Sequence, residues 1–119
     1  MAEEHDVRAS ARFVLASAQK VRLVVDQVRG RPAKEALDWL RFSRKAAAEP
    51  VRKVIHSAMA NAEKNFGLNP DDLVVARIWA DEGPTRRWRR FGARGRFKPI
   101  LRRSSHITVI LRERPGAAG

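Results

Sequence analysis

The chain has 119 residues, no cysteine and a formal net charge of +12. This length suits one domain with a single core, and 44% hydrophobic residues exclude a wholly disordered basic protein. The lack of cysteine excludes disulfides, thiol nucleophiles and thiolate metal sites. The first residues are acidic and no apolar run approaches the roughly 18 residues of a membrane span, which predicts a cytoplasmic protein.

The first 40 residues predict one strand and two helices. Alternation over 7–15 is typical of a half-buried strand, with five apolar residues on its inner face: Val7, Ala9, Ala11, Phe13 and Leu15. A first helix is expected over about 17–29, with Ser17 as its N-cap and Gly30 ending it in the left-handed conformation. Pro32 suits the first turn of a short second helix that reaches Leu40.

The third predicted helix is the longest element. It should begin between Ser43 and Ala47, hold Pro50 in its first turn and end at Gly67. Helical spacing gives it an inner face of seven apolar residues: Val51, Val54, Ile55, Ala58, Met59, Ala62 and Phe66.

After the turn signal at 69–72 the apolar period changes from helical to two. One strand should turn Val74, Ala76, Ile78 and Ala80 to one face, and a second should do the same with Ile107, Val109 and Leu111. Residues 83–112 contain ten basic residues and no acidic one, against 15 basic and 13 acidic residues elsewhere. A glycine-containing turn at 92–95 near the middle of this window predicts one long hairpin.

These elements predict an α+β fold, with three helices packed on a short antiparallel sheet and a long protruding basic β-hairpin. We expect a single domain over 1–119. Its globular part would cover about 7–82 and 104–112, its extended arm about 83–103, and a frayed tail 113–119.

The basic window has the composition of a polyanion-binding surface. The window contains nine arginines and one lysine: Arg86, Arg87, Arg89, Arg90, Arg94, Arg96, Lys98, Arg102, Arg103 and Arg112. Arginine is the basic residue that pairs bidentately with phosphate. Adjacent arginines would charge both faces of the ribbon, which favours burial within RNA. Trp88, Phe91 and Phe97 either stack on unpaired bases or pack on one another across the ribbon.

Catalytic and metal-binding motifs are absent from the sequence. The three histidines are His5, His56 and His106, and they show no metal-ligand spacing. His56 is expected at the rim of the third helix, and His106 either binds a phosphate or caps its strand. Asp81 and Glu82 would face opposite sides of a strand and pair with local arginines. We therefore expect no enzymatic activity, no cofactor and no metal.

Several segments resemble one ribosomal family. The segments DEGP at 81–84, ARGR at 93–96 and RRSSHITV at 102–109 resemble the signature of bacterial large-subunit ribosomal protein twenty-two. Residues 17–30 and 57–65 resemble the family's first and third helices, so the resemblance covers about 7–112. The chain departs from the family at Phe91-Gly92, where Pro-Arg is common, and at Ser17-Ala18, where Ser-Pro is usual.

The resemblance implies a structural protein of the large subunit, with its small α+β domain near the polypeptide exit and its hairpin tip in the tunnel wall. The implied role is assembly and scaffolding, and macrolide sensitivity in the family is linked to the tip. The implied partners are 23S rRNA, neighbouring large-subunit ribosomal proteins and the nascent polypeptide near the tip, with the protein a monomer within a cytoplasmic ribosome.

The arginine chemistry and the resemblance together give two predicted sets of site residues. The RNA-binding set is Arg12, Lys20, Arg22, Asn61, Asn65, Arg86, Arg87, Arg89, Arg90, Arg94, Arg96, Lys98, Arg102, Arg103, Ser105 and His106. The tunnel-tip set is Trp88, Arg89, Arg90, Phe91, Gly92, Ala93 and Arg94.

Two other functions compete with this interpretation. A DNA-binding architectural protein could insert a basic β-ribbon into a groove, with an aromatic wedge at its tip. A membrane-active protein would bind an anionic surface through the arm, although the arginine bias and the lack of a basic amphipathic helix disfavour it.

Overall fold

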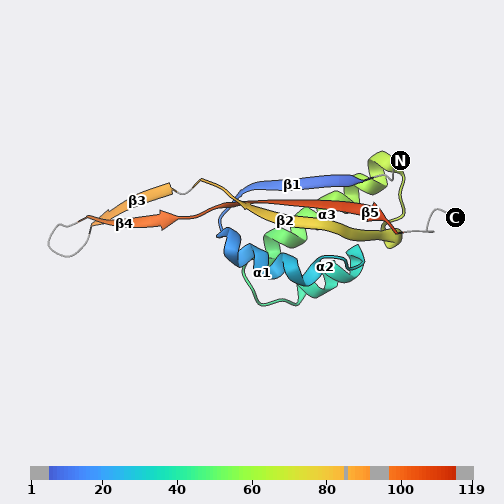
Figure 1. Cartoon of the computed structure of the whole chain (residues 1–119), viewed down its shortest axis with the longest axis horizontal. Coiled ribbons are helices and arrows are strands. Elements are labelled where there is room, and N and C mark those ends of the chain that lie inside the picture. Colours follow the sequence, from blue (N-terminus) through green and yellow to red (C-terminus); the bar gives the residue numbers. More distant parts are fainter. Residues whose placement is uncertain (1–5, 85, 92–96, 115–119) are drawn as a thin grey trace.

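The computed structural model describes residues 6–84, 86–91 and 97–114, and strands 86–91 and 97–102 are described by their backbone. Figure 1 shows a body of helices and strands from which a narrow two-stranded arm projects, and the principal extents are 70 × 28 × 21 Å. Here the body means the three-stranded sheet with its helices, and the arm means β3 (Arg86–Phe91) and β4 (Phe97–Arg102). The predicted α+β fold class with a projecting hairpin is confirmed.

The sheet of the body is antiparallel with strand order β1-β5-β2, so the C-terminal strand lies in the middle. Its strands are β1 (Val7–Val14), β2 (Leu73–Glu82) and β5 (Ser105–Glu113). The helices α1 (Ala18–Val28), α2 (Ala33–Arg41) and α3 (Ala48–Phe66) lie on one side of it. Helix α1 packs on β2, α3 packs on β1 and β5, and α2 packs on α3.

Helix α1 begins after the predicted N-cap Ser17, but it ends at Val28 with Arg29, in extended conformation, as its C-cap in place of the predicted Gly30. The Ser17 side chain accepts the Lys20 backbone N–H at 3.3 Å, which satisfies one of the free donors of the first turn. Gly30, one residue past the C-cap, has φ +82°, and its N–H donates to the Val75 carbonyl at 2.8 Å, so the turn after the helix also joins β2. Four valines form the fully buried face: Val21, Val24, Val25 and Val28.

The other helix boundaries depend on proline and glycine. Pro32 is the N-cap of α2, one residue before the first turn in which it was predicted. Pro50 lies in the first turn of α3, where a missing N–H costs no helical hydrogen bond. Gly67 ends α3 with φ +64°, and its N–H donates to the Glu63 carbonyl at 3.2 Å. A short 3-10 turn, Pro70–Asp72, leads into β2.

Three predicted inner-face residues prove to be exposed: Phe13 by 56%, Leu15 by 83% and Phe66 by 49%. The β1 ladder shifts register between Ala11 and Val14, and Phe13 has φ +58°. The regular alternation of inward and outward side chains is therefore interrupted at Phe13, which no longer shares the face of Val7, Ala9 and Ala11. Leu15 lies beyond the end of β1. Phe66 is the last residue of α3.

A second irregularity corrects the predicted face of β2. Register shifts between Val75 and Arg77, so an additional residue, Ala76, enters this strand. Leu73 and Val75 therefore point into the core with Ile78 and Ala80, whereas Val74 is only half-buried. On β5 the predicted core residues are confirmed as fully buried: Ile107, Val109 and Leu111.

The arm is a separate two-stranded antiparallel ladder. Its pairing runs from Arg86 with Arg102 to Phe91 with Phe97, which confirms the predicted hairpin strands. The predicted turn at 92–95 lies outside the described residues. In the part of the chain that the structure describes, no helix is long and apolar enough to cross a membrane.

Candidate nucleic-acid interface

The register of the arm sets basic residues directly opposite each other. Arg86 pairs with Arg102, and Arg90 pairs with Lys98. Like charges in directly opposed cross-strand positions destabilise a ribbon, and a two-stranded ribbon is only marginally stable in water. Such a pairing becomes favourable when a polyanion surrounds the ribbon and neutralises both members of each pair.

The aromatic positions of the arm fall into two places in the ladder. Phe91 lies directly opposite Phe97, at the last described pair before the turn. Trp88 lies opposite Ile100, so its direct cross-strand partner is aliphatic. The register brings Phe91 and Phe97 together and leaves Trp88 outside that pair, and stacking of the rings on bases stays a prediction.

The arm joins the body at the arm root, which consists of Gly83, Pro84, Arg103 and Ser104. The Gly83 N–H donates to the Ser104 carbonyl at 3.0 Å, and the Ser104 hydroxyl donates to the Pro84 carbonyl at 2.8 Å. A Cβ on Gly83 would lie 2.5 Å from the Ser104 hydroxyl oxygen. A side chain at position 83 would therefore displace the Ser104 hydroxyl.

His106 connects strands at the body end of the arm root. Its Nδ1 accepts the Phe13 backbone N–H at 3.1 Å, and the Phe13 ring stands edge-on to the imidazole with 5.0 Å between centroids. This bond satisfies an N–H at the irregular end of β1, where the regular ladder is interrupted. Of the two predicted roles, capping a strand is the one that this geometry displays.

Ser105 requires a correction to the predicted RNA-binding set. It is fully buried, because it lies on the same face of β5 as Ile107 and Val109, the face that packs against the helices. Its hydroxyl has no hydrogen-bond partner among the described residues. A side chain in this position is out of reach of an external partner.

Other predicted residues of the body lie at separate places on its surface. The Arg22 guanidinium donates twice to the Ala80 carbonyl, at 3.2 and 3.0 Å, and thereby ties α1 to β2. Asn61 and Asn65 are hydrogen-bonded to each other along α3. Arg12 is exposed on β1. Asp81 accepts a hydrogen bond from the Trp79 indole, and no ion pair of Asp81 or Glu82 is present among the described residues.

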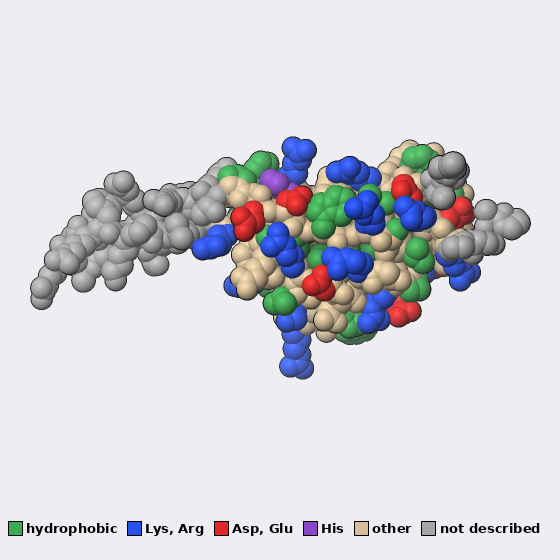
Figure 2. Space-filling view, in the orientation of Figure 1, with side chains coloured by type: hydrophobic (Ala, Val, Ile, Leu, Met, Phe, Trp, Pro, Cys, Tyr) green, Lys and Arg blue, Asp and Glu red, His purple; other side chains and the backbone are tan. Residues whose placement is uncertain are grey.

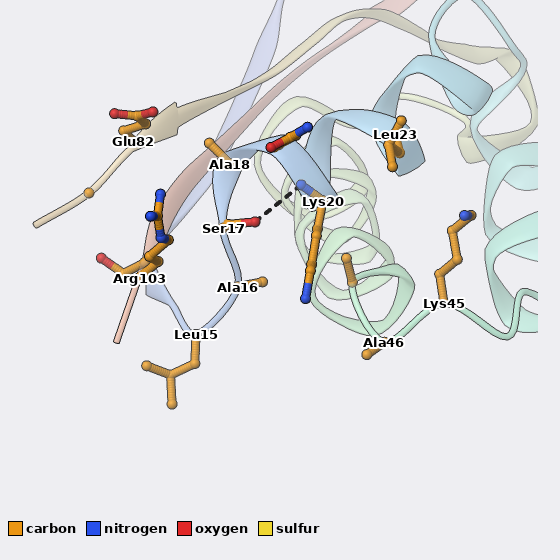
Figure 3. A pocket seen from close by; sticks show the side chains of 14 residues that line it. Leu15, Ala16, Ser17, Ala18, Lys20, Leu23, Lys45, Ala46, Glu82 and Arg103 are labelled. Atoms are coloured by element: carbon orange, nitrogen blue, oxygen red, sulfur yellow. Dashed lines mark hydrogen bonds between the residues drawn. The ribbon is translucent and has the colours of Figure 1, made fainter. Parts of the chain in front are cut away.

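A hollow of about 870 Å³ opens beside the arm root. Figure 3 shows Lys20 from α1, Lys45 from the loop before α3 and Arg103 from the arm root around it. Leu15 and Leu23, which are 83% and 55% exposed, lie on its wall. This arm-root hollow therefore combines cations from three separate elements with exposed apolar side chains.

Of the residues that line the hollow, Lys20 and Arg103 belong to the predicted RNA-binding set, whereas Lys45, Leu15 and Leu23 do not. Lys45 lies 25 residues from Lys20 in the chain, and only the packing of α1 beside the loop before α3 brings the two together. The signal that was available is the RFSRK segment at 41–45, where an aromatic residue lies among basic ones.

Ion pairs divide the cations of the body into two groups. Six basic residues contact a carboxylate: Arg29 with Asp26, Arg31 with Glu35, Lys34 with Asp71, Arg52 with Glu49, Arg112 with Asp6 and Arg114 with Asp72. Lys20, Lys45 and Arg103 make no such contact with a described residue. The arm-root hollow is thus lined by three cations that have no ion pair among the described residues, and by one carboxylate, that of Glu82.

Two of these pairs alter the titration of their carboxylates. The hydrogen bond from Arg112 holds the pKa of Asp6 below its ordinary value, and the hydrogen bond from Arg52 does the same to the pKa of Glu49. Arg112 belongs to the basic window, yet its guanidinium binds Asp6 at 2.7 and 3.0 Å and so holds the start of β1 against β5. Among the described residues there is no cluster of three or more metal-ligating side chains.

The projecting basic ribbon and the cationic root agree with the outcome of a comparison with protein families. The model of the family Ribosomal protein L22p/L17e matches residues 9–112, which spans the body and the arm. The chain therefore belongs to the ribosomal protein L22p/L17e family, whose members are non-enzymatic structural proteins of the large ribosomal subunit.

Proposed function

We propose that this protein binds 23S rRNA through its arm and arm root, assists assembly of the large subunit in the cytoplasm, and lines the polypeptide exit tunnel with its hairpin tip. The observation that carries the proposal is the register of the arm. Two of its six strand pairs oppose basic residues, Arg86 with Arg102 and Arg90 with Lys98, and no acidic residue lies in the window to compensate them. A partner dense in phosphate removes this repulsion.

The arm-root hollow extends the RNA-binding surface from the arm onto the body. Lys20, Lys45 and Arg103 surround it, and none has a carboxylate partner among the described residues. Together with Arg12 they continue the charge of the arm around its base. A ribbon inserted between RNA helices needs positive charge around its base, because phosphates then lie around its root as well as along its sides.

The tunnel-tip role rests on the family and on the position of the tip. Residues 88–91, the described part of the predicted tip, form the part of β3 that is farther from the arm root. In this proposal the tip reaches the tunnel wall and meets the nascent polypeptide, the body lies near the exit beside neighbouring large-subunit ribosomal proteins, and the protein is a monomer there.

The test is equilibrium binding of the protein to a 23S rRNA transcript over a series of salt concentrations. The arm variant carries four glutamines, at Arg86, Arg89, Arg90 and Arg102. If these residues contact four phosphates, the slope of log K against log salt should fall by roughly 3 to 4, at about 0.7 to 0.9 for each phosphate. Affinity near physiological salt should fall at least about 100-fold.

A matched control variant removes four positive charges from the body. It carries glutamine in place of four cations that are already paired with carboxylates: Arg31, Lys34, Arg52 and Arg114. The proposal expects this control to lose much less affinity than the arm variant. Equal losses would show that net charge alone governs binding. Equal affinity of the unaltered protein for duplex DNA and for 23S rRNA would favour an architectural DNA-binding protein instead.

A further inference from the structure

The side of the sheet that faces away from the helices carries two arginines in one row. Arg8 on β1 and Arg77 on β2 both pair with Ile110 of the central strand β5, so they occupy the two edge positions of that row. With about 4.8 Å between neighbouring strands, their Cα atoms are about 10 Å apart. Ile110 between them is half-buried and gives the row an apolar floor.

Both arginines converge on one aromatic ring. The guanidinium carbon of Arg8 lies 5.9 Å from the centre of the Trp79 indole, and that of Arg77 lies 5.6 Å from it. The indole N–H donates to the Asp81 carboxylate at 3.1 Å, which fixes the ring along β2. Two side chains from opposite edges of the sheet are therefore held at one place by a ring with a defined orientation.

Neither arginine of this Trp79 cluster contacts a carboxylate of the described residues. Two described acids that interact with members of the cluster, Asp6 and Asp81, also form hydrogen bonds. Asp6 binds Arg112 at 2.7 and 3.0 Å, although the charge of Arg77 also helps to lower its pKa, and Asp81 binds the indole. Both guanidinium groups therefore lie against one ring, and neither contacts a carboxylate of the described residues. Two convergent guanidinium groups provide the planar donors that bind a phosphate group.

The surroundings of the cluster favour an RNA strand over a single carboxylate. Arg12 lies four residues beyond Arg8 on β1, about 13 Å along the strand toward the arm root, and is also exposed. Arg12 thus extends the cationic positions of β1 toward the arm root, and Figure 2 shows Lys and Arg side chains, with Asp and Glu among them, over one side of the body. A chain of phosphates matches a track of this length, whereas one acidic side chain does not.

We propose that Arg8 and Arg77, positioned by Trp79, bind a backbone phosphate of an RNA strand that crosses the helix-free side of the sheet. The contact lies about five residues, or about 17 Å, from the arm root along β2, so it is separate from the arm and from the arm-root hollow. This inference rests on the proposed function, because the strand would belong to the same 23S rRNA that surrounds the arm.

The test compares an Arg8→Gln/Arg77→Gln variant with an Arg31→Gln/Arg52→Gln control, which removes the same charge from arginines already paired with glutamates. Binding to a 23S rRNA transcript is measured over a series of salt concentrations, and thermal unfolding confirms that each variant folds. We expect about 10-fold weaker binding and a salt slope lower by about 1 for the cluster variant, and a smaller change for the control.

A Trp79→Leu variant tests the positioning role of the ring, with Trp79→Phe as the conservative replacement. Both arginines remain, so net charge is unchanged. The leucine variant should bind a few-fold more weakly, and the phenylalanine variant should recover most of that loss. A ring that only stabilises the sheet would change the unfolding temperature and leave the salt slope of RNA binding unaltered.

The outcomes separate this inference from the proposed function. Unchanged RNA binding by the cluster variant, together with weak binding by the arm variant, overturns the phosphate site and leaves the proposed function intact. Failure of the unaltered protein to prefer 23S rRNA overturns both. A cluster variant that binds the naked transcript normally but enters large subunits poorly when the other ribosomal proteins are present assigns this surface to an acidic protein neighbour, and the RNA inference is then wrong.

Discussion

In the body, a three-stranded sheet packs against helices, whereas the two strands of the arm pair with each other in a separate sheet. The body buries a continuous apolar core, and its largest fully buried side chains include Ile55, Ile78 and Ile107. The arm opposes like charges in its own ladder. The comparison indicates that the sequence of the body is organised for stability and that of the arm for a partner.

The largest effect on folding is expected in the body core. Ile55 on α3 is fully buried, so Ile55→Ala should lower the free energy of unfolding by about 2–5 kcal/mol, since it removes apolar contacts and leaves a cavity. Chemical denaturation measures this loss. At temperatures where the variant stays folded, its affinity for 23S rRNA should match that of the unaltered protein. A loss of affinity in the folded variant would contradict the separation of the two regions.

A smaller effect is expected at the junction of the two regions. Gly83→Ala should cost about 1 kcal/mol, because its Cβ forces the Ser104 hydroxyl away from the Pro84 carbonyl. Hydrogen exchange of the residue 83 amide, which donates to Ser104, should speed up as well. In a Ser104→Ala background the same glycine substitution should cost less, because the clashing oxygen is gone. Strict additivity of the two substitutions would show that the close approach does not limit residue 83.

A still smaller effect is expected from the Asp6–Arg112 pair. The folded-state pKa of Asp6 is lowered, so its contribution is present at neutral pH and is lost as pH falls below about 4. Both side chains are 42% exposed, so screening by solvent limits this contribution to less than about 1 kcal/mol. Asp6→Asn should therefore flatten the acid limb of the stability profile. An identical pH dependence in this variant would show that the pair contributes nothing.

No effect on the folding of the body is expected when the end of the arm is removed. Deletion of residues 88–95 removes no member of the buried core. Unfolding should stay cooperative and its free energy should change by less than about 0.5 kcal/mol, while affinity for 23S rRNA falls. Loss of cooperative unfolding would mean that the arm and the body stabilise each other.

Most elements could be predicted because their signals are local. Helix α3 follows from a 3.6-residue apolar period that ends at Gly67, and Ser17 caps α1 through a hydroxyl three residues from its donor. The errors at Phe13 and Val74 arise where a strand changes register against β5, which is far away in the sequence. A bulge depends on the partner strand, so alternation within one strand could not reveal it.

Of the candidate site, too, the sequence predicted the parts that depend on local composition but not those that depend on contacts between distant segments. Composition was sufficient to place the arginine-rich window, including Arg103, in a hairpin, and the resemblance added Lys20. The burial of Ser105, the place of Lys45 beside the arm root and the convergence of Arg8 and Arg77 on Trp79 depend on how distant segments meet.

The sequence by itself determined the segregation of charge, the types of the elements and the family, because each can be read from local composition, period and motif. The tertiary structure decided which cations are neutralised and which converge. Arg112 binds Asp6 from the other end of the chain, whereas Arg8 and Arg77 both lie against one indole and contact no carboxylate of the described residues. The physical reason is that the electrostatic environment of a side chain depends on its neighbours in space, and strand order and register alone fix those neighbours.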